Sequence, residues 1–136
     1  MEIPDTKIIE FIRNHHVPNL ATSISDKPWC ANCFYTSDED TRHMQEAMVN
    51  AQVTSSIVLE TEIIGKIQGI QFEGMLIKSS ETLKNKLKIA YLKRFPYDIV
   101  STSPIWGLVL SHIKFTDNRL GFGKKLIWKK ELNEQI

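Results

Sequence analysis

The sequence lacks the features that mark membrane, secreted or nucleic-acid-binding proteins. Its 136 residues contain only two cysteines, and no apolar run approaches membrane-spanning length. The N-terminal MEIPDTKIIE has neither the basic start nor the long apolar core of a signal peptide. The formal net charge is only +1, so the chain carries no broad positive field that would attract nucleic acid. We therefore expect a cytoplasmic protein without nucleic-acid or membrane partners.

Motifs of the common enzyme classes are also missing. The stretch LGFGKKLIW, from Leu120 to Trp128, contains a Gly-Lys pair. A phosphate-binding P-loop needs a glycine five positions before that pair and a Ser or Thr after it, but Asn118 and Lys125 stand there. No Ser-His-Asp order or paired-carboxylate motif stands out. The alternating apolar residues of LGFGKKLIW instead predict a late strand with one apolar face.

The two cysteines form a CxxC motif, Cys30 and Cys33, directly after Trp29. They lie in an alternating segment, where residues three apart point to opposite faces and do not readily form a disulfide. We interpret both as buried structural thiols rather than as a redox pair. A zinc site would have to recruit distant histidines such as His43 and His112, since only the cysteine pair has the local spacing of metal ligands. We predict no metal site.

Helix and strand patterns fill most of the chain. Helices are predicted after an N-cap at Asp5, from the acidic TSDED into TRHMQEAMVN, and from Ser80 to Arg94 before Pro96. Strands are predicted for NLATSIS and WCANCFY around an Asp26-Lys27-Pro28 turn, for SSIVLE and GIQFEGMLIK, and for LVLSHIKF and LGFGKKLIW around residues 116–119. Gly74 interrupts its strand and predicts a bulge or a close backbone approach. The order indicates one domain over residues 1–136, an α+β fold with a predominantly antiparallel small barrel and peripheral helices.

The second predicted helix opens with Thr41-Arg42-His43. A hydroxyl and a guanidinium beside exposed backbone amides can bind a phosphate. The acidic residues 38–40 just before them would repel an anion unless they turn outward. From these residues alone, ordinary helix capping with a surface arginine is favoured over a phosphate site.

Several blocks resemble the YhbP group of the pyridoxamine 5'-phosphate oxidase-like, FMN-binding split-barrel superfamily. They are WCANCFY, TRHMQ, GIQFEG, AYLKRFP, PIW and, as the longest, IKFTDNRLGFGKKLIW. The resemblance implies a split β-barrel that usually forms a homodimer, with FMN at the subunit interface. The YhbP group has no settled reaction. A flavin brings its own redox chemistry, so the lack of a catalytic motif is compatible with a flavin-dependent oxidoreductase of unknown substrate.

By position, the resemblance also implies eight cofactor-binding residues. The start of the second helix would contact the FMN phosphate, and the second strand of the first hairpin would approach the isoalloxazine ring. Further candidates lie in the middle of the sheet and in the last strand, whose lysines would face an anionic ligand across the dimer. The residues are Thr41 and Arg42 for the phosphate, Ala31, Asn32 and Cys33 for the ring, and Gln71, Lys124 and Trp128 beyond these.

One departure from the family concerns the segment before the second helix. The family has another strand, about a dozen residues with its turn, between the segments matching CFY and TRHMQ. Here only Thr36 to Asp40 intervenes, and five residues extend to about 18 Å at most. If residues are missing from the sequence at this point, the Cα atoms of Tyr35 and Thr36 will lie much farther apart than the roughly 3.8 Å of a trans peptide bond. A true deletion would open one barrel wall and favour the alternative function, a non-enzymatic module that binds another small ligand or a partner protein without flavin.

Overall fold

The computed structural model describes residues 3–15, 18–32, 39–78, 81–94 and 106–130. The chain forms helices and strands, with short 3-10 turns at Ile64–Lys66 (η1) and Asn118–Leu120 (η3). The helices and strands are α1 (Thr6–Asn14), β1 (Asn19–Ile24), β2 (Lys27–Asn32), α2 (Arg42–Val49), β3 (Gln52–Val58), β4 (Gln68–Lys78), α3 (Glu81–Arg94), β5 (Trp106–Asp117) and β6 (Lys125–Lys129).

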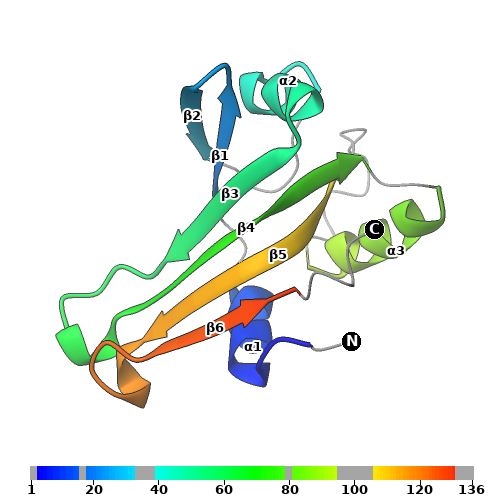
Figure 1. Ribbon diagram of the computed structural model, residues 1–136. Coiled ribbons are helices and arrows are strands. Elements are labelled where there is room, and N and C mark those ends of the chain that lie inside the picture. The colour runs from blue at the N-terminus through cyan, green and yellow to red at the C-terminus, as the bar shows by residue number, and fades with distance from the viewer. Residues whose placement is uncertain (1–2, 16–17, 33–38, 79–80, 95–105, 131–136) are drawn as a thin grey trace.

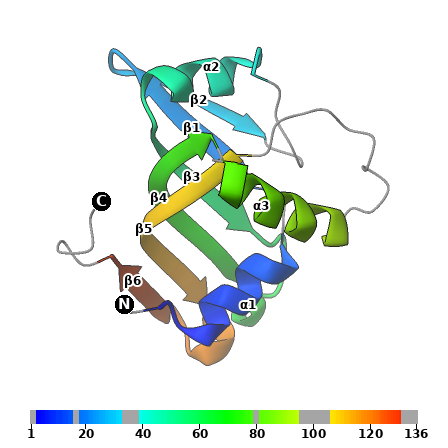
Figure 2. The same cartoon turned by 90° about the vertical axis from the view of Figure 1, so that its right-hand side faces the viewer.

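These strands form a six-stranded sheet in the order β2-β1-β3-β4-β5-β6, and every neighbouring pair is antiparallel. Figure 1 shows the long strands β3, β4 and β5 side by side, with β1 and β2 at one end of the sheet. In Figure 2 the sheet curves strongly, α1 and α3 lie over one side of it, and α2 lies by the β1–β2 end. The predicted α+β class, a predominantly antiparallel split barrel with peripheral helices, is confirmed.

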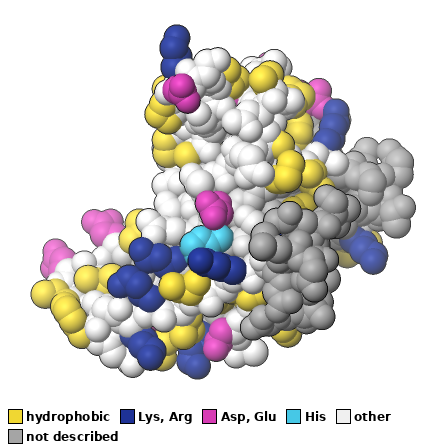
Figure 3. Space-filling view, in the orientation of Figure 1, with side chains coloured by type: hydrophobic (Ala, Val, Ile, Leu, Met, Phe, Trp, Pro, Cys, Tyr) yellow, Lys and Arg dark blue, Asp and Glu magenta, His cyan; other side chains and the backbone are white. Residues whose placement is uncertain are grey.

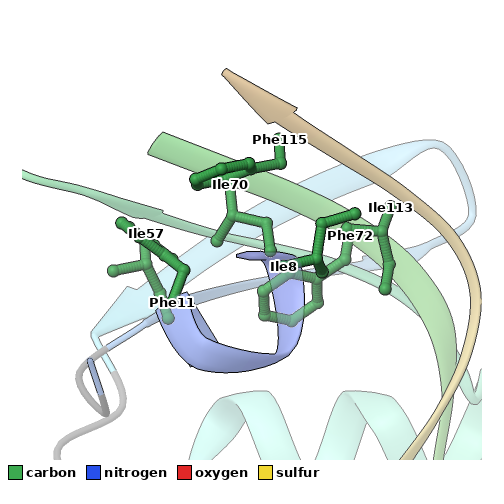
Figure 4. Close-up of a cluster of buried hydrophobic side chains, with 7 residues drawn as sticks. All are labelled: Ile8, Phe11, Ile57, Ile70, Phe72, Ile113 and Phe115. Atoms are coloured by element: carbon green, nitrogen blue, oxygen red, sulfur yellow. The ribbon is translucent and has the colours of Figure 1, made fainter. Parts of the chain in front are cut away.

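The main core lies between α1 and the inner face of the sheet. Asp5 begins α1 by accepting a hydrogen bond from the backbone N–H of Lys7 at 2.8 Å, as its N-cap position predicts. The helix then turns Ile8 and Phe11 towards the strands. Figure 4 shows both among the buried side chains of β3, β4 and β5, namely Ile57, Ile70, Phe72, Ile113 and Phe115.

A second, smaller core lies under α2. Met44 and Ala47 of this helix pack on Leu20 of β1 and Val53 of β3. The partly buried Leu76, Trp106 and Leu108 extend the cluster along the C-terminal end of β4 and the N-terminal end of β5. The two ends of the long β4–β5 pair therefore contribute to two different cores.

A β-bulge separates these two ends. Glu73 pairs with His112, but the next residue, Gly74, pairs with Leu110, so Ser111 is the extra residue of β5. Its hydroxyl donates a hydrogen bond to the carbonyl oxygen of Glu73 at 3.2 Å. A Cβ added at Gly74 would lie 2.2 Å from the carbonyl oxygen of Val109. Both parts of the prediction for Gly74, the bulge and the close backbone approach, are confirmed.

Two turns differ from their predictions. The first hairpin turns at Ser25 and Asp26, which have φ values of 49° and 63°, so the turn precedes the predicted one and Pro28 belongs to edge strand β2. An edge strand tolerates proline because the missing N–H needs no partner there. The last strand begins only at Lys125, because the positive φ values of Gly121 (139°) and Gly123 (69°) form a turn where a strand was predicted. Phe122 is accordingly 86% exposed rather than on a buried face. The Tyr35–Thr36 junction lies outside the described residues.

Candidate functional site

Polar side chains line the outer face of the sheet, opposite the main core. Residues that pair directly across antiparallel strands point to the same face. The strand registers therefore place one residue from each strand in a single row across the whole sheet. In order from β2 to β6, the row is Asn32, Asn19, Ser56, Gln71, Lys114 and Ile127.

A groove of about 360 Å³ follows the middle of this row and the row beside it. Its lining includes Gln71 and Lys114, and neither has a hydrogen-bond or ion-pair partner within the part of the chain that the structure describes. Asn19 is held in place, since its Oδ1 accepts hydrogen bonds from the backbone N–H and the hydroxyl of Ser56 at 3.1 and 3.0 Å. The groove thus offers a fixed polar wall with open amide and ammonium groups. Its volume lies within the range of small-ligand sites.

The second row contains a carboxylate–histidine pair. Glu73 of β4 lies directly opposite His112 of β5, and its Oε1 is 3.3 Å from Nδ1 of the imidazole. Both side chains line the groove and remain partly exposed. Figure 3 shows a histidine next to an acidic side chain on this face, with lysine or arginine side chains nearby. A carboxylate on Nδ1 fixes the orientation of the ring and leaves Nε2 open.

The start of α2 forms a separate cluster. The guanidinium carbon of Arg42 lies 4.0 Å from the centroid of the Trp29 ring, and its Nε donates to Oε1 of Glu46 at 3.2 Å. The second carboxylate oxygen of Glu46 accepts a hydrogen bond from the buried hydroxyl of Thr22. This hydrogen bond, and after it the contact with Arg42, lowers the pKa of Glu46 below its ordinary value. Arg42 is therefore fixed against the protein while its side chain stays 56% exposed.

The acidic segment before α2 is directed to other partners. Glu39 forms an ion pair with Lys78 at the end of β4, and its carbonyl oxygen accepts a hydrogen bond from Gln45 at 2.6 Å. One of the three carboxylates expected to repel an anion at this helix start is thus paired. Burial lowers the pKa of His43 and favours its neutral form.

The eight residues implied by the family resemblance do not gather in one place on this chain. Asn32 and Gln71 share the row on the outer face. Ala31 pairs with the buried Leu20 on the other face, and Trp128 pairs with the fully buried Ile113 and packs against the main core. Thr41 and Arg42 are at the start of α2, Lys124 is exposed in the turn before β6, and Cys33 lies outside the described residues.

Some groove residues were not predicted from the sequence, chiefly Asn19, Glu73, His112 and Lys114. Their alternation with apolar neighbours shows that they point away from the core. The alternation within one strand does not reveal which strands lie beside it or in which register they pair. The registers are what bring these four side chains into one groove.

The turn between β5 and β6 is anchored by an ion pair. Arg119 donates to both oxygens of the buried Asp117, at 2.9 to 3.3 Å, and also to the side-chain oxygen of Gln68 at 3.1 Å. The hydrogen bond from the Arg119 side chain holds the pKa of Asp117 below its ordinary value. Asn118 adds a hydrogen bond from its side-chain amide to the carbonyl oxygen of Ile64 at 2.9 Å. The glycines of this turn therefore serve a structural connection.

Three further observations concern the thiol, metal and membrane expectations. Cys30 is exposed on edge strand β2, so its prediction as a buried thiol is wrong. In the described part of the chain, the strand has a neighbour on one side only, and no helix covers the face to which Cys30 points. Over the described ranges, no three His, Cys, Asp or Glu side chains are grouped as metal ligands would be. No helix within those ranges is both long and apolar enough to cross a membrane.

Several solved structures share the architecture of this chain. A conserved hypothetical protein from Mycobacterium tuberculosis matches with a TM-score of 0.70 and 14% identity, covering 88% of each chain. A putative pyridoxamine 5'-phosphate oxidase from Listeria innocua matches with a TM-score of 0.59 and 14% identity, over 81% of this chain and 95% of that one. A heme-binding protein from Mycobacterium smegmatis matches with a TM-score of 0.66 and 15% identity, over 83% of this chain and 52% of that one. At such identities the likeness shows the fold alone.

Sequence relatives give the family. A UPF0306 protein from Photorhabdus laumondii is 39% identical over 134 residues, which cover 90% of this chain and 94% of that protein. A UPF0306 protein from Yersinia pestis is 36% identical over 143 residues, which cover 96% of this chain and 97% of that protein. The chain belongs to the UPF0306 family. No family model matches the sequence.

The Yersinia alignment also bears on the length of this chain. It runs over 143 positions, whereas 96% of these 136 residues is about 131. About a dozen positions of the relative therefore have no counterpart here. The chain is shorter than this relative by about the length of the strand with its turn that was expected before the second helix.

Proposed function

We propose that this protein binds FMN on the outer face of its sheet and supports flavin-dependent oxidation or reduction of a small substrate. The observation that carries the proposal is the polar row across the sheet. Asn32 and Gln71, two residues implied by the YhbP resemblance, lie in that row with Asn19 and Ser56 between them. We also propose that the chain falls within the YhbP group, as a single domain that forms a homodimer.

The side chains of the row suit the polar edge of a flavin. The isoalloxazine ring presents carbonyl oxygens, ring nitrogens and one N–H, and amide side chains can both donate to and accept from such groups. Gln71 has no competing partner among the described residues, and the groove beside it measures about 360 Å³. When bound, the flavin supplies the electron transfer, and the protein needs only to position it and exclude competing reactions.

The alternative is a split-barrel module that binds another small ligand or a partner protein without flavin. The observation that favours it is the shorter chain, since about a dozen positions of a UPF0306 relative have no counterpart here. If the missing positions form the expected strand, one wall beside the flavin would be absent.

A visible absorption spectrum separates the two functions. The protein is purified without added cofactor, and the spectrum is repeated after FMN is added and the excess removed by gel filtration. We expect retention of about one FMN per chain, because each chain carries one polar row. A protein of verified mass that retains no flavin in either sample contradicts the proposal and favours the cofactor-free module.

Two variants then test the row itself. Gln71→Ala removes an amide that faces the groove. It should lower the affinity for FMN by roughly tenfold, which corresponds to a loss of about 1.4 kcal/mol of binding free energy. Gln52→Ala is the matched control, since Gln52 is an exposed glutamine at the start of β3, outside the groove lining. Equal FMN affinity of the two variants would remove the row from the cofactor site.

A further inference from the structure

Charged side chains from the polar row and from the row beside it gather on β5. His112 and Lys114 are two residues apart on β5, so both side chains point outward and their Cα atoms are about 7 Å apart. Lys129 of β6 pairs directly with His112 on its other side. Both Lys114 and His112 line the groove.

From this arrangement, we propose that Lys114 and His112 form a binding site for a small oxyanion, the carboxylate or phosphate group of the protein's substrate. Glu73 is the positioning residue, because its carboxylate holds Nδ1 of His112 and turns Nε2 outward. Lys114 lies in the polar row directly opposite Gln71, so this site adjoins the proposed flavin site, and binding of a simple oxyanion tests it without FMN.

The charge around His112 favours an anion. The charged or titratable groups that face it are Glu73 from β4, Lys114 from its own strand and Lys129 from β6, while β3 contributes the uncharged Thr54. The single carboxylate is engaged with the imidazole at 3.3 Å. Lys114 has no hydrogen-bond or ion-pair partner in the described part of the chain, so its ammonium is available to a ligand.

The size of the groove limits the ligand. A volume of about 360 Å³ admits a compact molecule rather than a polymer. With Lys114 and His112 at the β5 side and the uncharged Asn19, Thr54 and Ser56 at the other, the groove fits a small acid or phosphate ester. A protonated imidazole adds a second charge-assisted hydrogen bond to the oxyanion.

Sulfate is a suitable probe, because it is a small dianion that contains no flavin. Sulfate is titrated into the purified protein, and binding is followed by the backbone amide NMR signals of β4 and β5. We expect the largest shifts at residues 71–73 and 112–114.

Three variants identify the groups involved. Lys114→Met should weaken sulfate binding by tenfold or more, and Lys114→Arg, which keeps the charge, should restore most of the affinity. His112→Gln removes the imidazole and should weaken sulfate binding several-fold. Lys27→Met, at the start of β2 and outside the groove lining, is the matched control and should behave like the wild type. Shifts centred elsewhere, or equal effects of Lys114→Met and Lys27→Met, would overturn the proposal whether or not FMN binds.

Discussion

Arg42 lies over the ring of Trp29, with its guanidinium carbon 4.0 Å from the ring centroid. The stacking joins the start of α2 to edge strand β2, and the hydrogen bond from Arg42 Nε to Glu46 fixes the plane of the guanidinium. The arginine is thus held in position before any ligand arrives. Such preorganisation reduces the entropy that a phosphate contact would otherwise cost.

The first prediction concerns this arginine as a phosphate ligand. If Arg42 contacts the FMN phosphate, Arg42→Ala should raise the dissociation constant of FMN by roughly 10- to 100-fold, because a charge-assisted hydrogen bond contributes about 1.5 to 3 kcal/mol. Arg42→Lys keeps the charge and should recover part of the affinity. The melting temperature should change little, since an exposed helical ion pair contributes about 0.3 to 0.5 kcal/mol. Fluorescence titration with FMN measures the effect, and unchanged affinity would exclude Arg42 from the site.

The second prediction concerns the main core. Ile113 is fully buried on the inner face of β5, so Ile113→Ala should lower the free energy of unfolding by about 2 to 5 kcal/mol. Ile127→Ala is the control in the neighbouring strand, because Ile127 is 60% exposed and its loss should cost under about 0.5 kcal/mol. Urea unfolding followed by circular dichroism measures both. Similar losses in the two variants would contradict the assignment of the two faces of the sheet.

The third prediction concerns the bulge. Gly74→Ala would place a Cβ 2.2 Å from the carbonyl oxygen of Val109, and a backbone atom cannot move aside cheaply. We expect a loss of about 3 kcal/mol or more, or failure to fold. Gly65→Ala has open space around the added Cβ and should leave stability within about 0.5 kcal/mol of the wild type. The comparison is made by soluble yield and urea unfolding, and a stable Gly74→Ala protein would show that β4 and β5 do not approach as described.

The fourth prediction concerns acid stability. The hydrogen bond from Arg119 lowers the pKa of Asp117 below its ordinary value of 3.8, so the unfolded chain binds this proton more readily than the folded one. The resulting stability is fully present above pH 3.8 and is lost as the pH falls through the lower, folded pKa. Asp117→Asn should reduce the melting temperature at pH 7 and flatten its decline between about pH 5 and pH 2. Glu62→Gln, an exposed carboxylate, serves as the control, and parallel curves for wild type and Asp117→Asn would contradict the ion pair.

Much of the fold could be predicted from local signals. Asp5 predicted the start of α1 and its cap, and Gly74 predicted the bulge. The error at Leu120–Lys124 has a clear physical cause. Alternation in LGFGKKLIW satisfied the strand pattern, but Gly121 and Gly123 adopt positive φ values that end the alternation, and local sequence does not show which conformation a glycine takes.

The candidate site was less predictable than the fold. Asn32 and Gln71 are far apart in the sequence and share a row only through the pairing of β2, β1, β3 and β4. Trp128 illustrates the opposite case, since its neighbour in the register is the buried Ile113 and its ring packs against the core. A sequence motif therefore identifies candidate residues, whereas the strand register decides on which face of the sheet each side chain lies.

One signal of the register was visible in β5. The more buried apolar residues fall at even positions in the first half (Trp106, Leu108 and Leu110) and at odd positions in the second (Ile113 and Phe115), while Val109 is 39% exposed. The change of phase occurs at Ser111, the extra residue of the bulge. Such a change within one strand predicts a bulge, because all of these side chains must still reach the inner face.

The same feature affects how the chain folds. β4 and β5 are joined through α3 and a long connection, so they must find each other without a tight turn to set their alignment. The apolar side chains in the two halves of β5 alternate out of phase. A β4–β5 register without the bulge would therefore expose the apolar side chains of one half to water. Only the register in which Ser111 is unpaired buries the apolar side chains of both halves. The extra residue therefore works as a check on correct strand pairing during folding.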